Sequence, residues 1–118
     1  MLQITAEMVL SELARRKGRD KGIHIAALVL SLTGERSCQA RERAVRKPVN
    51  ELRLEGHPIC AHPADGYYLA STAEEIEGTC NFLRSRAMSS LKAEARLRSI
   101  PVAELLGSIQ TATTTEGL

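Results

Sequence analysis

Apolar residues in the first part of the chain recur at helical spacing, at Ala6, Met8, Val9, Leu10 and Leu13. This spacing predicts a first helix over residues 6–17, with Thr5 as its N-cap and Gly18 as its stop. The next segment, residues 24–32, is almost wholly apolar, so periodicity alone fits a buried strand as well as a buried helix. Its Ala-Ala-Leu centre and the Gly34 that follows favour a helix, the central one of a three-helix domain, contacted on several sides.

A basic stretch after residue 36 carries an apolar stripe at Val45, Val49 and Leu52. The stripe predicts a third helix that has Ser37 as its N-cap and ends at Gly56. Pro48 conflicts with this prediction, because a proline inside a helix removes a hydrogen bond and costs about 3 kcal/mol. Either the helix is kinked there, or it consists of two pieces with Pro48 in the first turn of the second. We prefer one kinked helix.

Two short strands are predicted next, over residues 58–61 and 67–70, with Asp65-Gly66 in the hairpin turn between them. Successive strand residues point to opposite faces. We therefore expect one of Tyr67 and Tyr68 in the core and the other partly exposed. By the same alternation, only one of Ile59 and Cys60 should belong to the core.

An amphipathic helix is predicted from about residue 71 to Arg98, where Pro101 ends it, and a short helix is expected over 102–109. The apolar stripe of the longer helix packs either back on the domain or, as we expect, against the same helix of a second chain to form a homodimer. The residues of the expected dimer contact are Ile76, Cys80, Leu83, Ala87 and Leu91.

Composition agrees with a mainly helical chain. Of the 118 residues 43% are hydrophobic, but there are only one Phe, two Tyr and no Trp, which disfavours an all-β sandwich. The predicted fold class is mainly α with a small β-hairpin: three helices and a wing, followed by a C-terminal amphipathic helix. The expected organisation is a first domain in residues 1–70, whose partner the charges described next indicate, a helical extension in 71–110 and a disordered tail in 111–118.

The charge distribution indicates a nucleic-acid partner better than the net charge of +2 does. Residues 15–21 hold five Lys or Arg against one Asp, and residues 41–53 hold five against two Glu. Arg and Asn on a helix can pair with base edges, and flanking cations bind phosphates. The alternative is an ordinary solvated helix face.

Other functions find little support in the sequence. The spacing of His57, Cys60 and His62 lacks the pattern of a zinc site, and the three cysteines suggest no disulfide framework, so no metal or cofactor is expected. No phosphate-binding, nucleophile-elbow or HExxH motif is present, and we predict that the protein is not an enzyme. Without a signal peptide or an apolar run of roughly 20 residues, we expect no membrane partner and a cytoplasmic protein.

The string VRKPVNELRLEGHPICAHPADGYYLA, followed by STAEEI, resembles the winged-helix domains of bacteriophage and prophage proteins. It is similar, more loosely, to the N-terminal DNA-binding domain of the biotin repressor. The shared features are Val49, Leu52, Arg53 and Gly56, then Pro58-Ile59, then Gly66-Tyr67-Tyr68, and the resemblance covers about residues 23–90. Two departures are Pro48, where the family has a helix former, and the long turn over residues 34–37.

The resemblance implies a recognition helix that binds double-stranded DNA and a wing over residues 62–65. The residues expected to contact DNA are Arg36, Ser37, Gln39, Arg41, Arg43, Arg46, Lys47, Asn50 and His62, with Arg15, Arg16 and Lys17 as phosphate anchors. The expected role is transcriptional regulation in a bacterial host cell. The alternative is an accessory DNA-binding or protein-docking factor in phage DNA replication, with a phage or host protein as partner.

Overall fold

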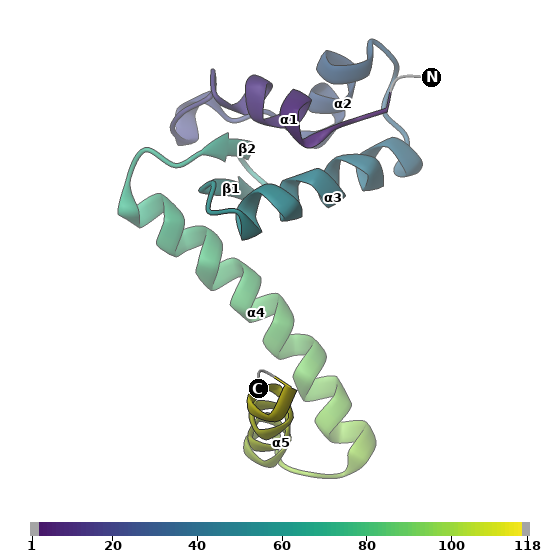
Figure 1. Cartoon of the computed structure of the whole chain (residues 1–118), viewed down its shortest axis with the longest axis vertical. Coiled ribbons are helices and arrows are strands. Elements are labelled where there is room, and N and C mark those ends of the chain that lie inside the picture. Colours follow the sequence, from purple (N-terminus) through teal and green to yellow (C-terminus); the bar gives the residue numbers. More distant parts are fainter. Residues whose placement is uncertain (1–2, 117–118) are drawn as a thin grey trace. The chain divides into compact units, whose positions relative to one another are not determined.

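The computed structural model describes residues 3–116, with their side chains as far as residue 110. These residues form five α-helices, a short 3-10 helix and a two-stranded antiparallel sheet (Figure 1). The predicted class, mainly helical with a small sheet, is therefore confirmed. The chain divides into two compact units, Met1–Thr79 and Cys80–Leu118. None of the described helices combines the length and the apolar character needed to cross a membrane.

The first helix, α1 (Ala6–Leu13), begins where predicted and ends earlier. The hydroxyl of Thr5 accepts a hydrogen bond of 3.2 Å from the Met8 amide, which confirms Thr5 as the N-cap. The prediction that this helix continues to Lys17 was wrong. The chain leaves the helix because it pairs with the second strand: the Gly18 amide donates to the Leu69 carbonyl at 2.8 Å.

The second helix, α2 (Ile25–Thr33), confirms the helical interpretation of the apolar segment. Gly34 ends it in the left-handed conformation, with φ 72°. Only Leu28 and Val29 of α2 are buried, whereas Leu30 is 54% exposed. The helix therefore packs along one side and is not the enclosed central helix that its composition suggested.

The third helix, α3 (Gln39–Leu54), is continuous through Pro48. Pro48 is buried on the same side of the helix as Val45, Val49 and Leu52. Its missing N–H removes one hydrogen bond of the helix at this position. The predicted N-cap was wrong by one residue. Cys38 occupies that position without a side-chain cap, and the Ser37 hydroxyl instead donates to the Glu42 carboxylate at 2.6 Å.

The hairpin consists of β1 (Ile59–His62) and β2 (Gly66–Leu69), paired antiparallel from Ile59–Leu69 to His62–Gly66. Residue Ile23 pairs with Tyr67 on the other edge of β2. This pairing explains Gly66, which has a φ of 78° and whose added Cβ would lie 2.3 Å from the Ile23 carbonyl oxygen. The 3-10 helix (Arg19–Lys21) lies just before this contact.

Both faces of the hairpin are covered. Ile59 belongs to the main core with residues of α1, α2 and α3, whereas Cys60, Tyr68 and Ala70 form a second cluster. The Cys60 thiol donates to the Glu75 carbonyl at 3.5 Å, which places the following helix over this cluster. The expectation that only one of Ile59 and Cys60 is buried was therefore wrong. The split between the tyrosines is confirmed, since Tyr68 is 4% exposed and Tyr67 is half-buried.

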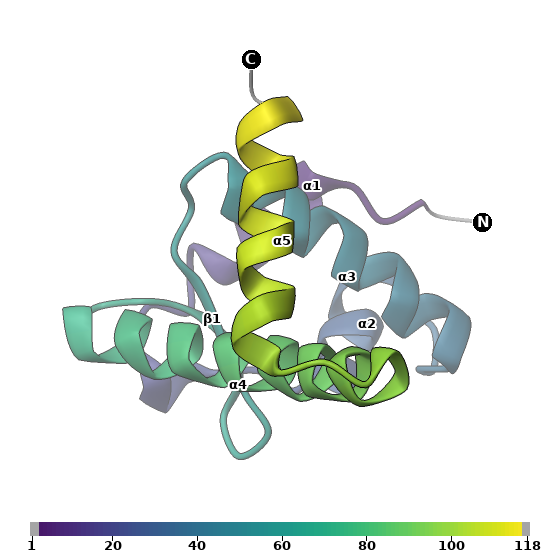
Figure 2. The same ribbon diagram turned by 90° about the horizontal axis from the view of Figure 1, so that it is seen from below.

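The fourth helix, α4 (Ala73–Arg98), begins with a reciprocal cap. The Glu75 amide donates to the Thr72 hydroxyl, and the Glu75 carboxylate accepts from the Ser71 amide. The fifth helix, α5 (Val102–Glu116), follows and runs in a different direction from α4 (Figure 2). It includes six residues of the segment expected to be a tail, and residues 117–118 lie outside the described part.

Candidate nucleic-acid interface

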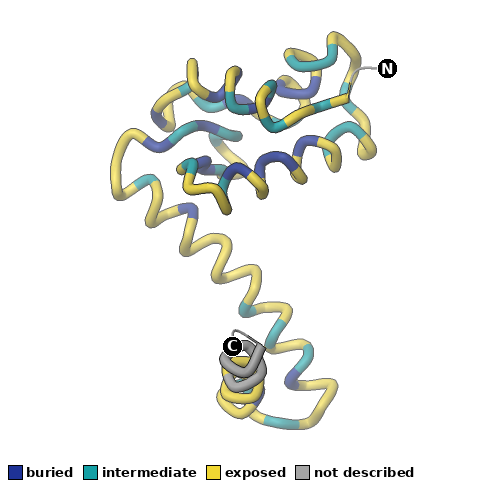
Figure 3. Tube along the Cα trace, in the orientation of Figure 1, coloured by how far each residue is buried: buried dark blue, intermediate teal, exposed yellow. Residues whose placement is uncertain are grey.

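The face of α3 directed away from the core is polar and exposed. Val45, Pro48, Val49 and Leu52 are buried, and Figure 3 shows the buried part of α3 on the side that faces α1. At about 100° per residue, the opposite side of the helix carries residues spaced four, three and four apart. These are Arg43, Lys47, Asn50 and Leu54, all of them exposed, and Arg46 and Gln39, also exposed, lie on one flank.

The cations of α3 differ in whether a carboxylate neutralises them. Arg41 forms an ion pair with Glu35 and also donates to the Arg36 carbonyl at 2.8 Å. Among the residues that the structure describes, Arg43, Arg46 and Lys47 take part in no ion pair. Their charge is therefore available to an anionic ligand, whereas that of Arg41 is largely compensated by Glu35.

The residues around the start of α3 that were expected to contact DNA fall into two groups. Arg36 is exposed and contributes its backbone carbonyl to Arg41, and Gln39 is exposed in the first turn. Ser37 is half-buried and its hydroxyl is bound to Glu42. Ser37 therefore holds the loop onto α3, and its side chain is less available than those of its neighbours.

Two of the expected phosphate anchors are bound by a buried carboxylate. Glu12 is 6% exposed and accepts from Arg15 at 2.8 Å, from Arg16 at 3.1 Å and from the Ser31 hydroxyl at 2.5 Å. The Ser31 hydrogen bond is the main reason that the pKa of Glu12 lies below its ordinary value, although burial opposes it. The structure thus places Arg15 and Arg16 in a network that joins α1 to α2, while Lys17 is exposed.

The hairpin turn is held by a cation that sequence reasoning did not single out. Arg19 donates to the Asp65 carboxylate at 2.6 Å, and this contact raises the pKa of Arg19. His62 accepts from the Ala64 amide through Nδ1 at 3.0 Å, and the same nitrogen lies 3.6 Å from Asp65. Arg19 belongs to the basic run over residues 15–21. Its role differs from that of the other cations in this run because it contacts Asp65, which is distant in the sequence.

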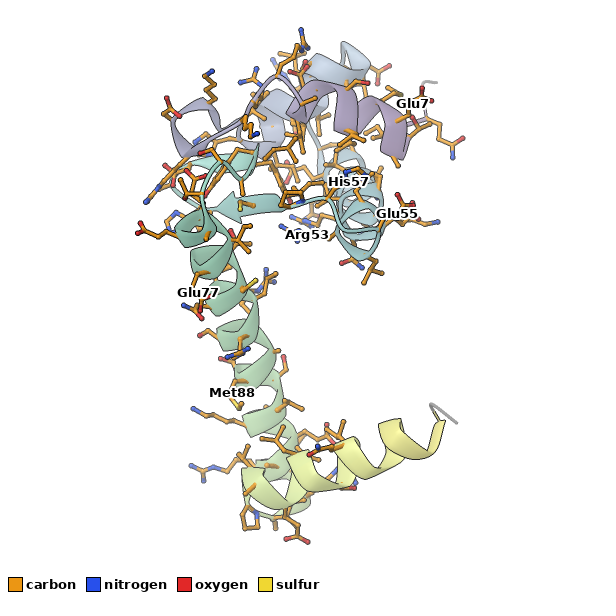
Figure 4. The ribbon with its side chains drawn as sticks, turned by 60° about the vertical axis from the view of Figure 1, so that its left-hand side comes forward. Glu7, Arg53, Glu55, His57, Glu77 and Met88 are labelled. Carbon is orange, nitrogen blue, oxygen red and sulfur yellow. The ribbon has the colours of Figure 1, made fainter. Side chains whose placement is uncertain are left out.

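The hairpin is also joined to the end of α3. Arg53 donates to the Ile59 carbonyl at 2.9 Å, and Figure 4 labels Arg53, Glu55 and His57 where α3 passes into β1. This hydrogen bond uses the guanidinium for structure. It joins the last turn of α3 to the first residue of β1.

A groove of about 1000 Å³ runs beside α3. Residues 3–6 form one wall, and Ala40, Ala44 and Pro48 of α3 line its apolar part. Arg43 and Lys47 also border it, together with the acidic Glu35 and Glu51. The groove thus separates the cationic face of α3 from the start of the chain.

The stripe expected to form the dimer contact is largely unpartnered in the described chain. Ile76 is 42% and Leu83 40% exposed, Cys80 and Ala87 are exposed, and Leu91 is half-buried. Among the described residues, no group of three or more His, Cys, Asp or Glu side chains is placed to hold a metal ion.

Comparisons with protein-family models, with curated proteins and with solved structures find no match for this chain. The fold class, mainly helical with a two-stranded antiparallel sheet, therefore rests on the structure itself.

Proposed function

We propose that this protein is a winged-helix protein that binds double-stranded DNA sequence-specifically, with α3 as its recognition helix and the β1–β2 hairpin as its wing. Three helices followed by an antiparallel hairpin is the order of elements that the winged-helix resemblance implies. An α-helix fits the major groove, where Arg and Asn side chains pair with guanine and adenine edges.

The observation that carries the proposal is the exposed face of α3. Arg43, Arg46 and Lys47 are exposed there without an ion pair in the described chain, and Asn50 lies beside them. A solvated face that serves only solubility would commonly intersperse acidic side chains with the basic ones. In α3 the two acidic residues, Glu42 and Glu51, lie at the two edges of this face, and Glu42 is bound to Ser37.

Dimerisation is a second part of the proposal. Ile76 and Leu83 leave an apolar stripe exposed on α4, and the same stripe of a second copy would cover it. Two copies would bind two half-sites related by the dimer axis, so the preferred DNA site would be a palindrome. Transcriptional regulation is the role we favour, because a dimer on a palindromic site is the usual arrangement of a repressor or activator.

A protein-docking module in phage DNA replication is the second candidate. The groove between residues 3–6 and α3 supports it, because apolar grooves beside a helix also bind peptides. Fold alone does not decide between the two functions, since winged helices serve both.

The test is the binding of a fluorescent duplex pool, measured by anisotropy over a range of salt concentrations. The DNA-binding proposal expects binding at low salt that weakens steeply as salt rises, because phosphate contacts release counterions. Absence of duplex binding at low salt would favour protein docking. Selection of bound duplexes from a random pool then gives the preferred DNA site. Copies of that site near promoters in a genome would support regulation, and copies near replication origins would support replication.

A further inference from the structure

Among residues 3–79, the described part of the first unit, the most exposed large apolar side chain lies on the proposed recognition face. Leu54 is 82% exposed and belongs to neither hydrophobic cluster. It also does not line the groove beside α3. Packing within Met1–Thr79 therefore gives no reason for a leucine at this position.

The position of Leu54 on the helix is specific. It follows Asn50 by four residues, so the two side chains are neighbours on one face. Arg43, Lys47, Asn50 and Leu54 together form a single line about 16 Å long, at about 1.5 Å per residue. At about 3.4 Å per base pair, this line matches roughly five steps of a duplex.

In the major groove the apolar feature that a leucine can contact is the C5-methyl group of thymine. Asparagine pairs bidentately with adenine, and arginine with guanine. We infer that Leu54 is a specificity-determining residue that contacts a thymine methyl group, one or two base pairs from the adenine that Asn50 reads. This inference rests on the proposed function, and it adds which base the C-terminal end of α3 selects.

The Arg53 contact supports a fixed position for this end of the helix. Its hydrogen bond to the Ile59 carbonyl anchors the last turn of α3 to the hairpin, next to Leu54 in the sequence. A side chain on an anchored turn can discriminate a methyl group, because its distance from the base does not vary freely.

The experiment begins with selection of bound duplexes by the wild-type protein and by Leu54→Ala. A matched control is Leu97→Ala, which changes a leucine that is 88% exposed on α4. The wild type and Leu97→Ala should select the same thymine one or two base pairs from the adenine, and Leu54→Ala should accept any base there. Circular dichroism checks that each variant is folded, which the exposure of both leucines leads us to expect.

The second step replaces that thymine by deoxyuridine, which lacks only the methyl group. Wild-type affinity should fall about three- to fivefold, as loss of one buried methyl group implies, and the affinity of Leu54→Ala should not change. Equal sensitivity of both proteins to deoxyuridine, or an unchanged selected site, would overturn the role of Leu54 while leaving DNA binding intact. Absence of duplex binding by the wild type would instead overturn the proposed function.

Discussion

The hydroxyl of Ser31 in α2 donates a 2.5 Å hydrogen bond to the buried carboxylate of Glu12 in α1. The same carboxylate binds Arg15 and Arg16, so one acidic group joins two helices and fixes two cations. A buried charge with these partners is costly to disrupt, because its removal leaves polar groups without their hydrogen bonds.

Glu12→Gln should lower the free energy of unfolding at pH 7 by about 1–3 kcal/mol, because the neutral amide binds the arginines and Ser31 less well. The pKa of Glu12 lies below its unfolded value of 4.5 in the folded protein, so its stabilisation is present above pH 4.5 and is lost as the pH falls through the lowered pKa. Urea unfolding of both proteins from pH 7 to pH 3 measures this. If the difference in free energy of unfolding between the wild type and Glu12→Gln stays constant over the whole pH range, the Glu12 carboxylate does not stabilise the fold in its charged form.

Arg43→Ala and Arg46→Ala should each weaken binding to the selected duplex by about 1–3 kcal/mol if the residue reads a base. If the residue binds phosphate instead, its replacement should lower the affinity for all sequences alike. The slope of the logarithm of the binding constant against the logarithm of the salt concentration should then decrease by about one. Arg41→Ala is the comparison within the same helix, and we expect a smaller loss because Glu35 already neutralises Arg41. If both Arg43 and Arg46 variants bind as the wild type does in anisotropy at fixed salt, α3 is not the recognition helix.

Gly66→Ala should lower the free energy of unfolding by about 3 kcal/mol for two reasons. Alanine is strained in the left-handed conformation of residue 66, and its Cβ would clash with the Ile23 carbonyl. Gly78→Ala is the matched control, since this glycine lies within α4 with open space around its Cβ. The control should gain about 1 kcal/mol from helix propensity. Thermal unfolding of both variants compares them, and a well-tolerated Gly66→Ala would mean that the hairpin does not pack on residue 23 as described.

Leu83→Arg should convert the protein from a dimer to a monomer, because two copies of the α4 stripe would then bring like charges together in an apolar contact. Ser85→Arg places the same charge about half a turn away on α4 and should leave the dimer intact. Sedimentation equilibrium at micromolar concentration measures the mass of each protein. A wild-type protein that is already monomeric there would remove this part of the proposal.

The sequence predicted the helices and strands because their caps, turns and apolar repeats depend on residues that are close together in the chain. Thr5 caps α1 through an amide three residues away, and the stripe of Val45, Val49 and Leu52 follows from the helical repeat. The turn at Asp65-Gly66 and the alternation of Tyr67 and Tyr68 are local in the same sense. Such signals gave the order of helices and strands and the exposed basic face of α3.

Only the tertiary structure decided which of the basic residues are paired and which side chains are buried. Arg19 meets Asp65 across 46 positions of sequence, Glu12 meets Ser31 across 19, and Cys60 is buried because α4 covers its face of the hairpin. α1 stops early for the same reason, since Gly18 bonds to Leu69. These outcomes depend on contacts between distant segments, and the periodicity of a single segment carries no information about its distant partners. The sequence therefore determined the helices and the hairpin, and the packing between them determined which cations remain available to a ligand.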